Sequence, residues 1–165
     1  MRPTLTVAAE LLGKELFYGD KSGVIVETEA YIGESDPACH AARGLTPRTQ
    51  TMYMAGGTAY VYLIYGMYFC LNFVTERADF PAAVLIRAVC AKNVPFKTTN
   101  GPGKLCRYFG ITTKDDKADI VSRPDFGVND TNPTPAFVTT PRVGIKRGTD
   151  KLWRFVAEPS FLDIF

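Results

Sequence analysis

The chain has 165 residues, of which 46% are apolar and 22% are charged, and its formal net charge is +2. This length suits one domain with a sizeable core, so we expect residues 1–165 to form a single domain. The sequence has no apolar run long enough to span a membrane and no N-terminal signal-peptide pattern, which argues against a membrane-spanning or secreted class and predicts an intracellular protein of the cytoplasm, nucleoid or nucleus.

The N-terminal region predicts one helix and one turn. Residues 6–16 carry apolar side chains at helical spacing, and Thr6 can cap the helix that this spacing predicts. We assign this helix to packing and expect no chemistry from it. Residues 19–23 then form a turn, rich in glycine and polar residues, that leads into a strand.

Residues 24–32 are rich in β-branched side chains and alternate in polarity, which predicts a strand. Alternation puts five residues on an expected core face, namely Val24, Val26, Thr28, Ala30 and Ile32. The opposite face carries Ile25, Glu27, Glu29 and Tyr31. Two interpretations are open for this second face. It is either a solvated face whose glutamates pair with basic neighbours, or an aromatic-walled pocket in which burial raises the pKa of a carboxyl group toward the range useful for proton transfer.

The next two segments predict a loop and a hairpin. Residues 33–51 read as a loop that contains His40, the only histidine; a lone histidine is more often structural, but loops beside a rigid strand commonly carry binding groups. Residues 58–74 predict a β-hairpin with its bend near Tyr65 and Gly66. Most tyrosines of this hairpin suit cross-strand packing. Tyr65 fits that role poorly, because an aromatic side chain at an exposed tip suits insertion between nucleic-acid bases.

The second half of the chain predicts further strands and one short helix. Residues 84–89 form a strand with Arg87 inside an apolar run, which makes Arg87 a candidate partner for Glu29 or for substrate. Residues 101–106 read as a loop that enters a short helix, whose N-terminus weakly favours phosphate. Residues 114–140 predict a surface excursion, and residues 142–145 and 152–157 predict short strands joined by a turn at Gly148. These strand predictions alone support an α+β fold class.

The acidic residues are unevenly distributed along the sequence, and residues that commonly bind metals are few. No Asp or Glu occurs in residues 37–75 or 80–114, so the lysines and arginines there predict a basic surface and a polyanionic partner, with chance clustering as the alternative. The four cysteines, Cys39, Cys70, Cys90 and Cys106, form no C-x-x-C motif and are expected to be buried free thiols. With one histidine, no metal site is expected.

Six ordered blocks of the sequence resemble the alkyladenine (3-methyladenine) DNA glycosylase family. They are residues 25–31 (IVETEAY), His40 with 46–48 (TPR), 60–72 (YVYLIYGMYFCLN), 85–88 (LIRA), 101–106 (GPGKLC) and 142–144 (RVG), and the similarity runs from about residue 7 to the C-terminus. The resemblance implies one mixed α/β domain with a curved, mainly antiparallel sheet, flanking helices and a protruding DNA-inserting hairpin. It also implies a monofunctional hydrolase of base excision repair, acting without a cofactor or metal, as a monomer, on double-stranded DNA. Such an enzyme flips out alkylated or deaminated purines (3-methyladenine, 7-methylguanine, hypoxanthine, ethenoadenine), cuts their N-glycosidic bond and leaves an abasic site.

The resemblance also implies roles for individual residues. Glu29 corresponds to the general base that activates water, and Arg87 and the backbone of Val143 correspond to groups that hold that water. The flipped base is expected to lie between Tyr31, His40 and Tyr62, with Asn72 crowding the amino group of undamaged guanine. Tyr65 is expected to fill the hole in the duplex and Met52 to probe the opposite strand. Further DNA contacts are expected from Thr46, Arg48, Lys104 and Gly144.

Two alternatives remain at this point. The segment between Arg87 and Gly101 is shorter than in many relatives, which leaves room for a nucleic-acid-binding module with little chemistry. Glu27 and Glu29 are also spaced like the acid/base pair of a carbohydrate hydrolase. The acid-free basic segments favour a nucleic acid over a neutral sugar.

Overall fold

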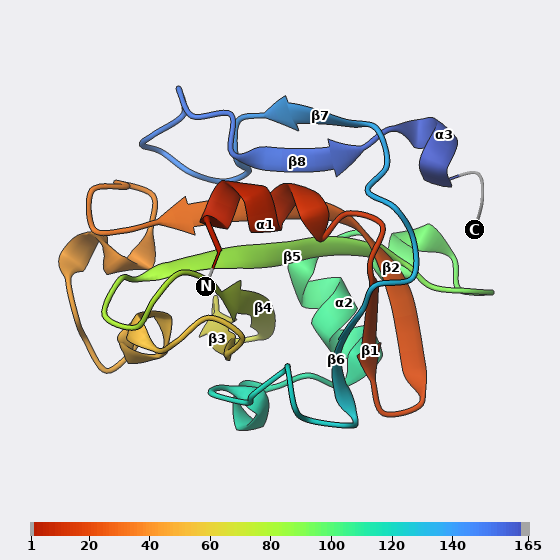
Figure 1. Cartoon of the computed structure of the whole chain (residues 1–165), viewed down its shortest axis with the longest axis horizontal. Helices are drawn as coiled ribbons and strands as arrows, with labels where there is room; N and C mark the ends of the chain where they lie inside the picture. Colours follow the sequence, from red (N-terminus) through yellow and green to blue (C-terminus); the bar gives the residue numbers. More distant parts are fainter. Residues whose placement is uncertain (1, 163–165) are drawn as a thin grey trace.

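The computed structural model describes residues 2–162, which fold into a curled antiparallel sheet with helices packed on it (Figure 1). The described strands are β1 (Glu15–Tyr18), β2 (Lys21–Ile32), β3 (Ala59–Ile64), β4 (Tyr68–Val74), β5 (Ala82–Cys90), β6 (Phe126–Asn129), β7 (Phe137–Thr140) and β8 (Arg154–Ala157). The α-helices are α1 (Thr4–Glu10), α2 (Pro102–Phe109) and α3 (Pro159–Leu162). Short 3₁₀ turns are η1 (His40–Arg43), η2 (Gln50–Tyr53), η3 (Phe96–Thr98) and η4 (Thr113–Asp115). The predicted α+β class with a curved antiparallel sheet and flanking helices is confirmed.

Strand β2 is the centre of the sheet, whose main path runs β3-β4-β5-β2-β1-β6. One edge of β2 pairs with β5 along most of its length. The other edge pairs first with β1, through residues 21–24, and then with β8, through residues 27–29. Helix α1 lies across β2 and β5 (Figure 1), so β2 is covered on one face and paired on both edges.

The register between β2 and β5 shifts twice, so the predicted faces of β2 are wrong for Ile25 and Val26. Pairing passes from Ile25–Val89 to Glu27–Ala88 and then to Thr28–Ile86, so Val26 and Arg87 are skipped in turn. A bulge of this kind reverses the alternation beyond it. Ile25 therefore belongs to the main core, on the face expected for Val26, and Val26 packs in a separate cluster with Ala88 and Cys90. From Thr28 to Ile32 the predicted alternation holds.

The first helix is shorter than predicted and begins earlier. It spans Thr4–Glu10, with Pro3 as its N-cap and no side-chain cap, so the predicted cap at Thr6 is wrong. Gly13 has a left-handed backbone (φ +84°), and its Cβ position lies only 2.6 Å from the carbonyl oxygen of Pro133. The chain turns there because glycine tolerates both the left-handed backbone and the close approach of another backbone segment. The residues that follow form β1 instead of continuing the predicted helix.

The C-terminal part differs from the prediction in two further places. The expected surface excursion over residues 114–140 contributes β6, which pairs with β1, and β7, which pairs with β8. Residues 142–145 form a turn through Val143 and Gly144 and not the predicted strand. The predicted hairpin, the strand around Arg87 and the short helix after Gly101 are confirmed as β3–β4, β5 and α2.

The main core lies between the curled sheet and the two longer helices. Ala8 and Leu12 from the N-terminal segment, Leu105 and Phe109 from α2, and Ile86 from β5 belong to one buried cluster. The four cysteines are free and buried, as predicted. A second cluster, around Met52, Tyr60 and Ala83, packs under the loop that follows β2. This second cluster supports the walls of the cavity described next.

Candidate active site

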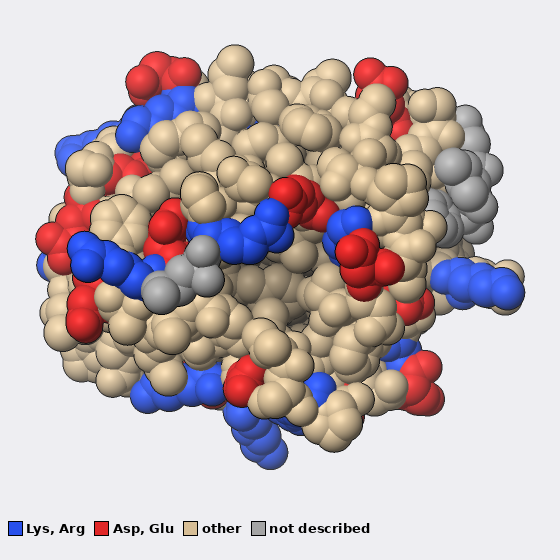
Figure 2. Space-filling model, viewed as in Figure 1, with Lys and Arg blue, Asp and Glu red and all other residues tan. Residues whose placement is uncertain are grey.

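A cavity of about 1340 Å³ opens beside β2–β5 and the β3–β4 hairpin. Among the described residues that line it, the basic side chains are Arg43, Arg48, Arg87, Lys104, Arg107, Lys146 and Arg147, and Glu34 is the only acid. The face of the molecule that carries α1 has no such bias, because basic and acidic side chains alternate across it (Figure 2). The basic surface expected from the sequence therefore lies around the cavity.

Cross-strand register brings the site residues onto one face of the sheet. Glu29 pairs with Leu85, Leu85 with Asn72, and Asn72 with Tyr60, which makes one row across β2, β5, β4 and β3. Residues directly opposite one another in a sheet point to the same face. The neighbouring row contains the pair Tyr62–Cys70. Residues far apart in the sequence thus meet because these strands are paired in this register.

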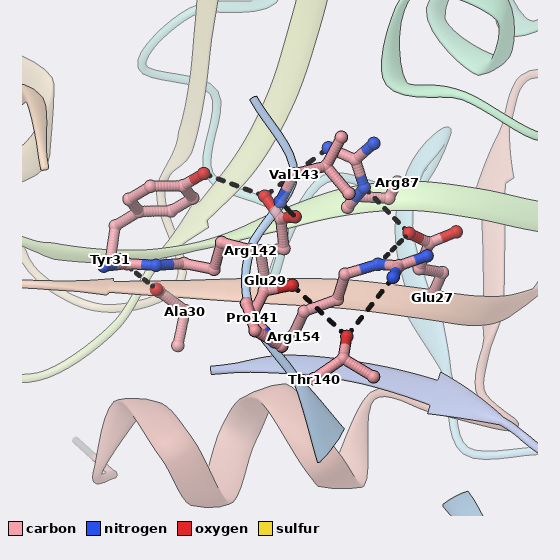
Figure 3. Close-up of polar contacts among 10 residues, drawn as sticks. All are labelled: Glu27, Glu29, Ala30, Tyr31, Arg87, Thr140, Pro141, Arg142, Val143 and Arg154. Carbon is pink, nitrogen blue, oxygen red and sulfur yellow. Dashed lines mark hydrogen bonds and ion pairs between the residues drawn. The ribbon is translucent and has the colours of Figure 1, made fainter. Parts of the chain in front are cut away.

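Glu29 is fully buried and held by three donors directly behind the cavity wall (Figure 3). The backbone N–H of Val143 donates to Oε1 at 2.7 Å, and the Tyr31 hydroxyl donates to Oε2 at 2.8 Å. Arg87 Nη1 contacts Oε2 at 3.4 Å, the longest of the three contacts. All three donor residues line the cavity. The carboxylate itself therefore does not line the cavity, but the three residues that bind it do.

Arg87 also connects Glu29 to Glu27. Its Nε donates to Glu27 Oε1 at 2.8 Å, and Arg154 Nε donates to the same oxygen at 2.6 Å (Figure 3). Burial disfavours the charge on Arg87, but Glu29 and Glu27 outweigh that effect and raise the pKa of the guanidinium. Glu27 is thus bound by two cations, and both glutamates of the pair are held as hydrogen-bond acceptors. This arrangement does not support the acid/base pair that a carbohydrate hydrolase would need.

Aromatic rings form the walls of the cavity. The His40 and Tyr62 rings meet edge to face, with centroids 4.6 Å apart, and Tyr60 lies 5.2 Å from Tyr62. Burial, together with the charges of Arg48 and Arg43, lowers the pKa of His40, which favours a neutral ring. Burial and the neighbouring Glu29 carboxylate raise the pKa of Tyr31, so its hydroxyl stays a donor to Glu29.

The other predicted site residues lie around this centre. Asn72 Nδ2 donates to the carbonyl oxygen of Tyr60 at 3.1 Å, which fixes its amide beside the cavity. Tyr65 is 84% exposed at the hairpin tip, with a left-handed backbone (φ 53°). The cavity rim also includes Thr46, Arg48, Lys104 and Gly144. Met52 also lines the cavity but is only 2% exposed, within the second core cluster, so its contact with the opposite DNA strand stays a prediction.

Sequence reasoning missed two charged residues at the site, Arg142 and Asp36. Both are buried, and they form an ion pair immediately beside Val143 and Tyr31. The signal for Asp36 was its place as the last acid before the acid-free segment. Arg142 was noted only as part of a resembling block. Their pairing could not be inferred, because 106 positions separate them in the chain.

The described residues contain no group of three or more His, Cys, Asp or Glu side chains placed to hold a metal ion. Of the helices in residues 2–162, none combines the length and the apolar character that crossing a membrane requires.

Comparison with known proteins identifies the family. Residues 1–160 match the methylpurine-DNA glycosylase (MPG) family. The chain belongs to this family. It is 58% identical over 154 residues to a protein of Sodalis glossinidius, 53% identical over 155 residues to one of Rickettsia felis, and 52% identical over 154 residues to one of Wolbachia pipientis from Culex pipiens. Each is named as a candidate 3-methyladenine DNA glycosylase; the matches cover 93–94% of this chain and 91%, 88% and 84% of the three relatives. The MPG match includes every residue of the cavity.

Proposed function

We propose that this chain excises alkylated purines from double-stranded DNA, with Glu29 as the residue that activates water. Membership of the MPG family makes it a DNA-3-methyladenine glycosylase, a hydrolase of N-glycosyl bonds in base excision repair. The observation that carries the assignment of residues is the position of Glu29. It is a buried carboxylate, held by Val143, Tyr31 and Arg87 directly behind the wall of a cavity with aromatic side chains and a basic rim.

The cavity suits a nucleotide turned out of the duplex. Extruding a base costs a few kcal/mol, and damaged or mispaired bases cost least. Stacking on aromatic side chains returns about 1–3 kcal/mol per base, and Tyr31, His40 and Tyr62 supply such rings. Tyr65 at the exposed tip is placed to fill the space that the base leaves. The lysines and arginines of the rim neutralise phosphates.

The reaction breaks the bond between C1′ of deoxyribose and the purine nitrogen, and the departing base takes the electron pair. Positive charge develops on the sugar, and the Glu29 carboxylate stabilises it. Water then forms the new C1′–O bond and gives a proton to Glu29. Each Glu29 oxygen already accepts one strong hydrogen bond, but a carboxylate oxygen can accept two. Oε2 accepts from both Tyr31 and Arg87, whereas Oε1 accepts from the Val143 N–H alone, so we place the water at Oε1.

The range of substrates follows from the walls of the cavity. Bases such as 3-methyladenine and 7-methylguanine carry positive charge when linked to the sugar, and electron-rich ring faces attract cations. Neutral lesions such as hypoxanthine and ethenoadenine depend on stacking alone. The fixed amide of Asn72 supports exclusion of the guanine amino group. All the groups that this scheme needs come from one chain, which supports action as a monomer, and the repair of DNA implies action inside the cell.

The variant Glu29→Gln tests the proposal. In single-turnover assays with a duplex that contains one hypoxanthine, we expect base release to fall about 10²- to 10⁴-fold, because a general base is lost. Binding to a duplex with an uncleavable abasic-site analogue should remain. Glu15→Gln removes a carboxylate of β1 that contacts Asn129 and serves as the matched control.

Two outcomes would count against the proposal. A Glu29→Gln protein as fast as the parent would remove the mechanism. Salt-sensitive duplex binding by the wild-type protein without release of any base would instead favour a binding module.

A further inference from the structure

The buried ion pair of Arg142 and Asp36 lies outside the chemistry proposed above. Both side chains are fully buried, and the two guanidinium nitrogens donate to the two carboxylate oxygens at 2.5 and 2.8 Å. Arg142 Nη1 also donates to the carbonyl oxygen of Ala30 at 2.9 Å (Figure 3). The guanidinium stacks over the rings of Tyr31, at 4.7 Å, and Trp153, at 5.1 Å.

These contacts join three segments around the candidate catalytic carboxylate. Asp36 belongs to the loop after β2, and it also accepts from the backbone N–H groups of Ile32 and Ala38. Arg142 belongs to the turn before β8, and the next residue, Val143, donates its N–H to Glu29 at 2.7 Å. One guanidinium thus joins that turn, the end of β2 and the following loop.

The pair is a costly way to hold these segments if stability is its only role. Buried ion pairs often add no net stability compared with well-packed apolar side chains of similar size. Arg142 Nε is moreover buried without a hydrogen-bond partner, and an unsatisfied buried donor is unfavourable. Gly148 packs against the pair, and its Cβ position lies 3.1 Å from Arg142 Nη2, so the space around the guanidinium is closely fitted. The feature that apolar residues could not reproduce is the directed contact to several acceptors at once.

We propose that Arg142, held by Asp36, is a positioning residue that sets the Val143 N–H against Glu29 and the Tyr31 ring against the cavity. The inference rests on the proposed function, because it assigns Glu29 the catalytic role. Arg142 touches neither base nor sugar in this scheme. It acts by fixing the backbone on one side of the carboxylate and the aromatic ring on the other.

The test compares the chemical step, duplex binding and thermal stability of full-length variants. The decisive variant is the double substitution Arg142→Met/Asp36→Leu, which replaces the pair by apolar side chains of similar size. Arg142→Lys keeps the positive charge but loses the bidentate contact with Asp36. Arg123→Gln breaks a partly exposed ion pair with Asp115 and Asp125, away from the cavity, and is the matched control.

We expect the double variant to melt near the wild-type temperature and to bind an abasic-site duplex within about threefold of wild type, because the basic rim is untouched. Its single-turnover release of hypoxanthine should fall about 10- to 100-fold, since a misplacement of about 1 Å can cost that much. Arg142→Lys should be intermediate, and Arg123→Gln unchanged in rate.

A folded double variant with the wild-type rate would overturn the inference. If the double variant does not fold, Arg142→Lys decides in the same way: a slowed chemical step with unchanged binding supports positioning, and a wild-type rate rejects it. Failure of the proposed function would look different, because the wild-type protein itself would then release no base.

Discussion

The two faces of β2 differ in what they contact. On one face, Ile25, Thr28 and Ala30 pack against α1 and the main core, and the polar atom of Thr28 is satisfied by the carbonyl oxygen of Ala8 at 2.8 Å. On the other face, Glu27, Glu29 and Tyr31 meet arginines and backbone donors beside a cavity. Both faces are largely buried, yet one contains methyl groups and the other contains charges.

This difference teaches that one strand can carry the stability of the fold and its chemistry on separate sides. Apolar burial supplies most of the favourable free energy of folding. Buried charges contribute little net stability, but their directed hydrogen bonds fix a carboxylate in place. Substitutions on the core face should therefore lower the free energy of unfolding, and substitutions on the charged face should lower the rate of base release.

The largest expected effect on stability is that of Leu12→Ala, in the main core against which the first face of β2 packs. Leu12 is fully buried in the main cluster, so truncation should lower the free energy of unfolding by about 2–5 kcal/mol. Urea denaturation would measure the loss. The rate of base release per folded molecule should stay at the wild-type value, and a fall comparable to that of Glu29→Gln would break the separation of the two faces.

On the charged face, Tyr31→Phe should slow base release about tenfold, the scale of one hydrogen bond to a charged group. The substitution removes the hydroxyl that donates to Glu29 and keeps the ring that lines the cavity. Single-turnover rates would measure the change, with duplex binding unaltered. Tyr53→Phe, which removes a similar bond from tyrosine to Glu34, is the control. Equal rates for both variants would show that the hydroxyl at Tyr31 does not act through Glu29.

The smallest expected effect is a gain in stability at the hairpin tip. Tyr65 and Gly66 both have positive φ angles, 53° and 68°, and Asn-Gly is the preferred pair for such a turn. Tyr65→Asn should therefore raise the free energy of unfolding by about 0.5–1 kcal/mol, while base release falls because the inserted ring is lost. Thermal melting and excision assays would measure both. A stability loss would mean that the exposed ring contributes to the fold.

Local sequence patterns were sufficient to predict the elements in which all the local signals favour the same structure. The central strand, the β3–β4 hairpin and α2 were predicted because their polarity pattern, glycines and prolines all favour one structure. In the segment Glu15–Tyr18, residues 15 and 16 were assigned to the end of a helix, because Leu16 falls on the helical spacing of Leu11 and Leu12. It is a strand because β2 and β6 pair with both of its edges, and a local pattern contains no information on such partners.

The candidate site shows the same division. Glu29 and Arg87 could be proposed from the sequence because charged residues inside apolar strands are unusual, whereas the role of Tyr31 and the preference for Glu29 came from the family resemblance. The burial of Met52 and the pairing of Arg142 with Asp36 could not be predicted from the sequence, because both depend on loops that fold over the sheet. The bulge that changes the faces of Ile25 and Val26 is likewise a property of the paired strands, and it has no local signal.

The sequence by itself determined the family, the types of the central elements and the identity of the groups around the carboxylate at position 29. The tertiary structure decided which atoms hold that carboxylate. Its donors besides Tyr31 come from a turn 114 positions away and from a neighbouring strand. The physical reason is that hydrogen bonds depend on distances of about 3 Å, and only the packed chain brings such distant residues that close.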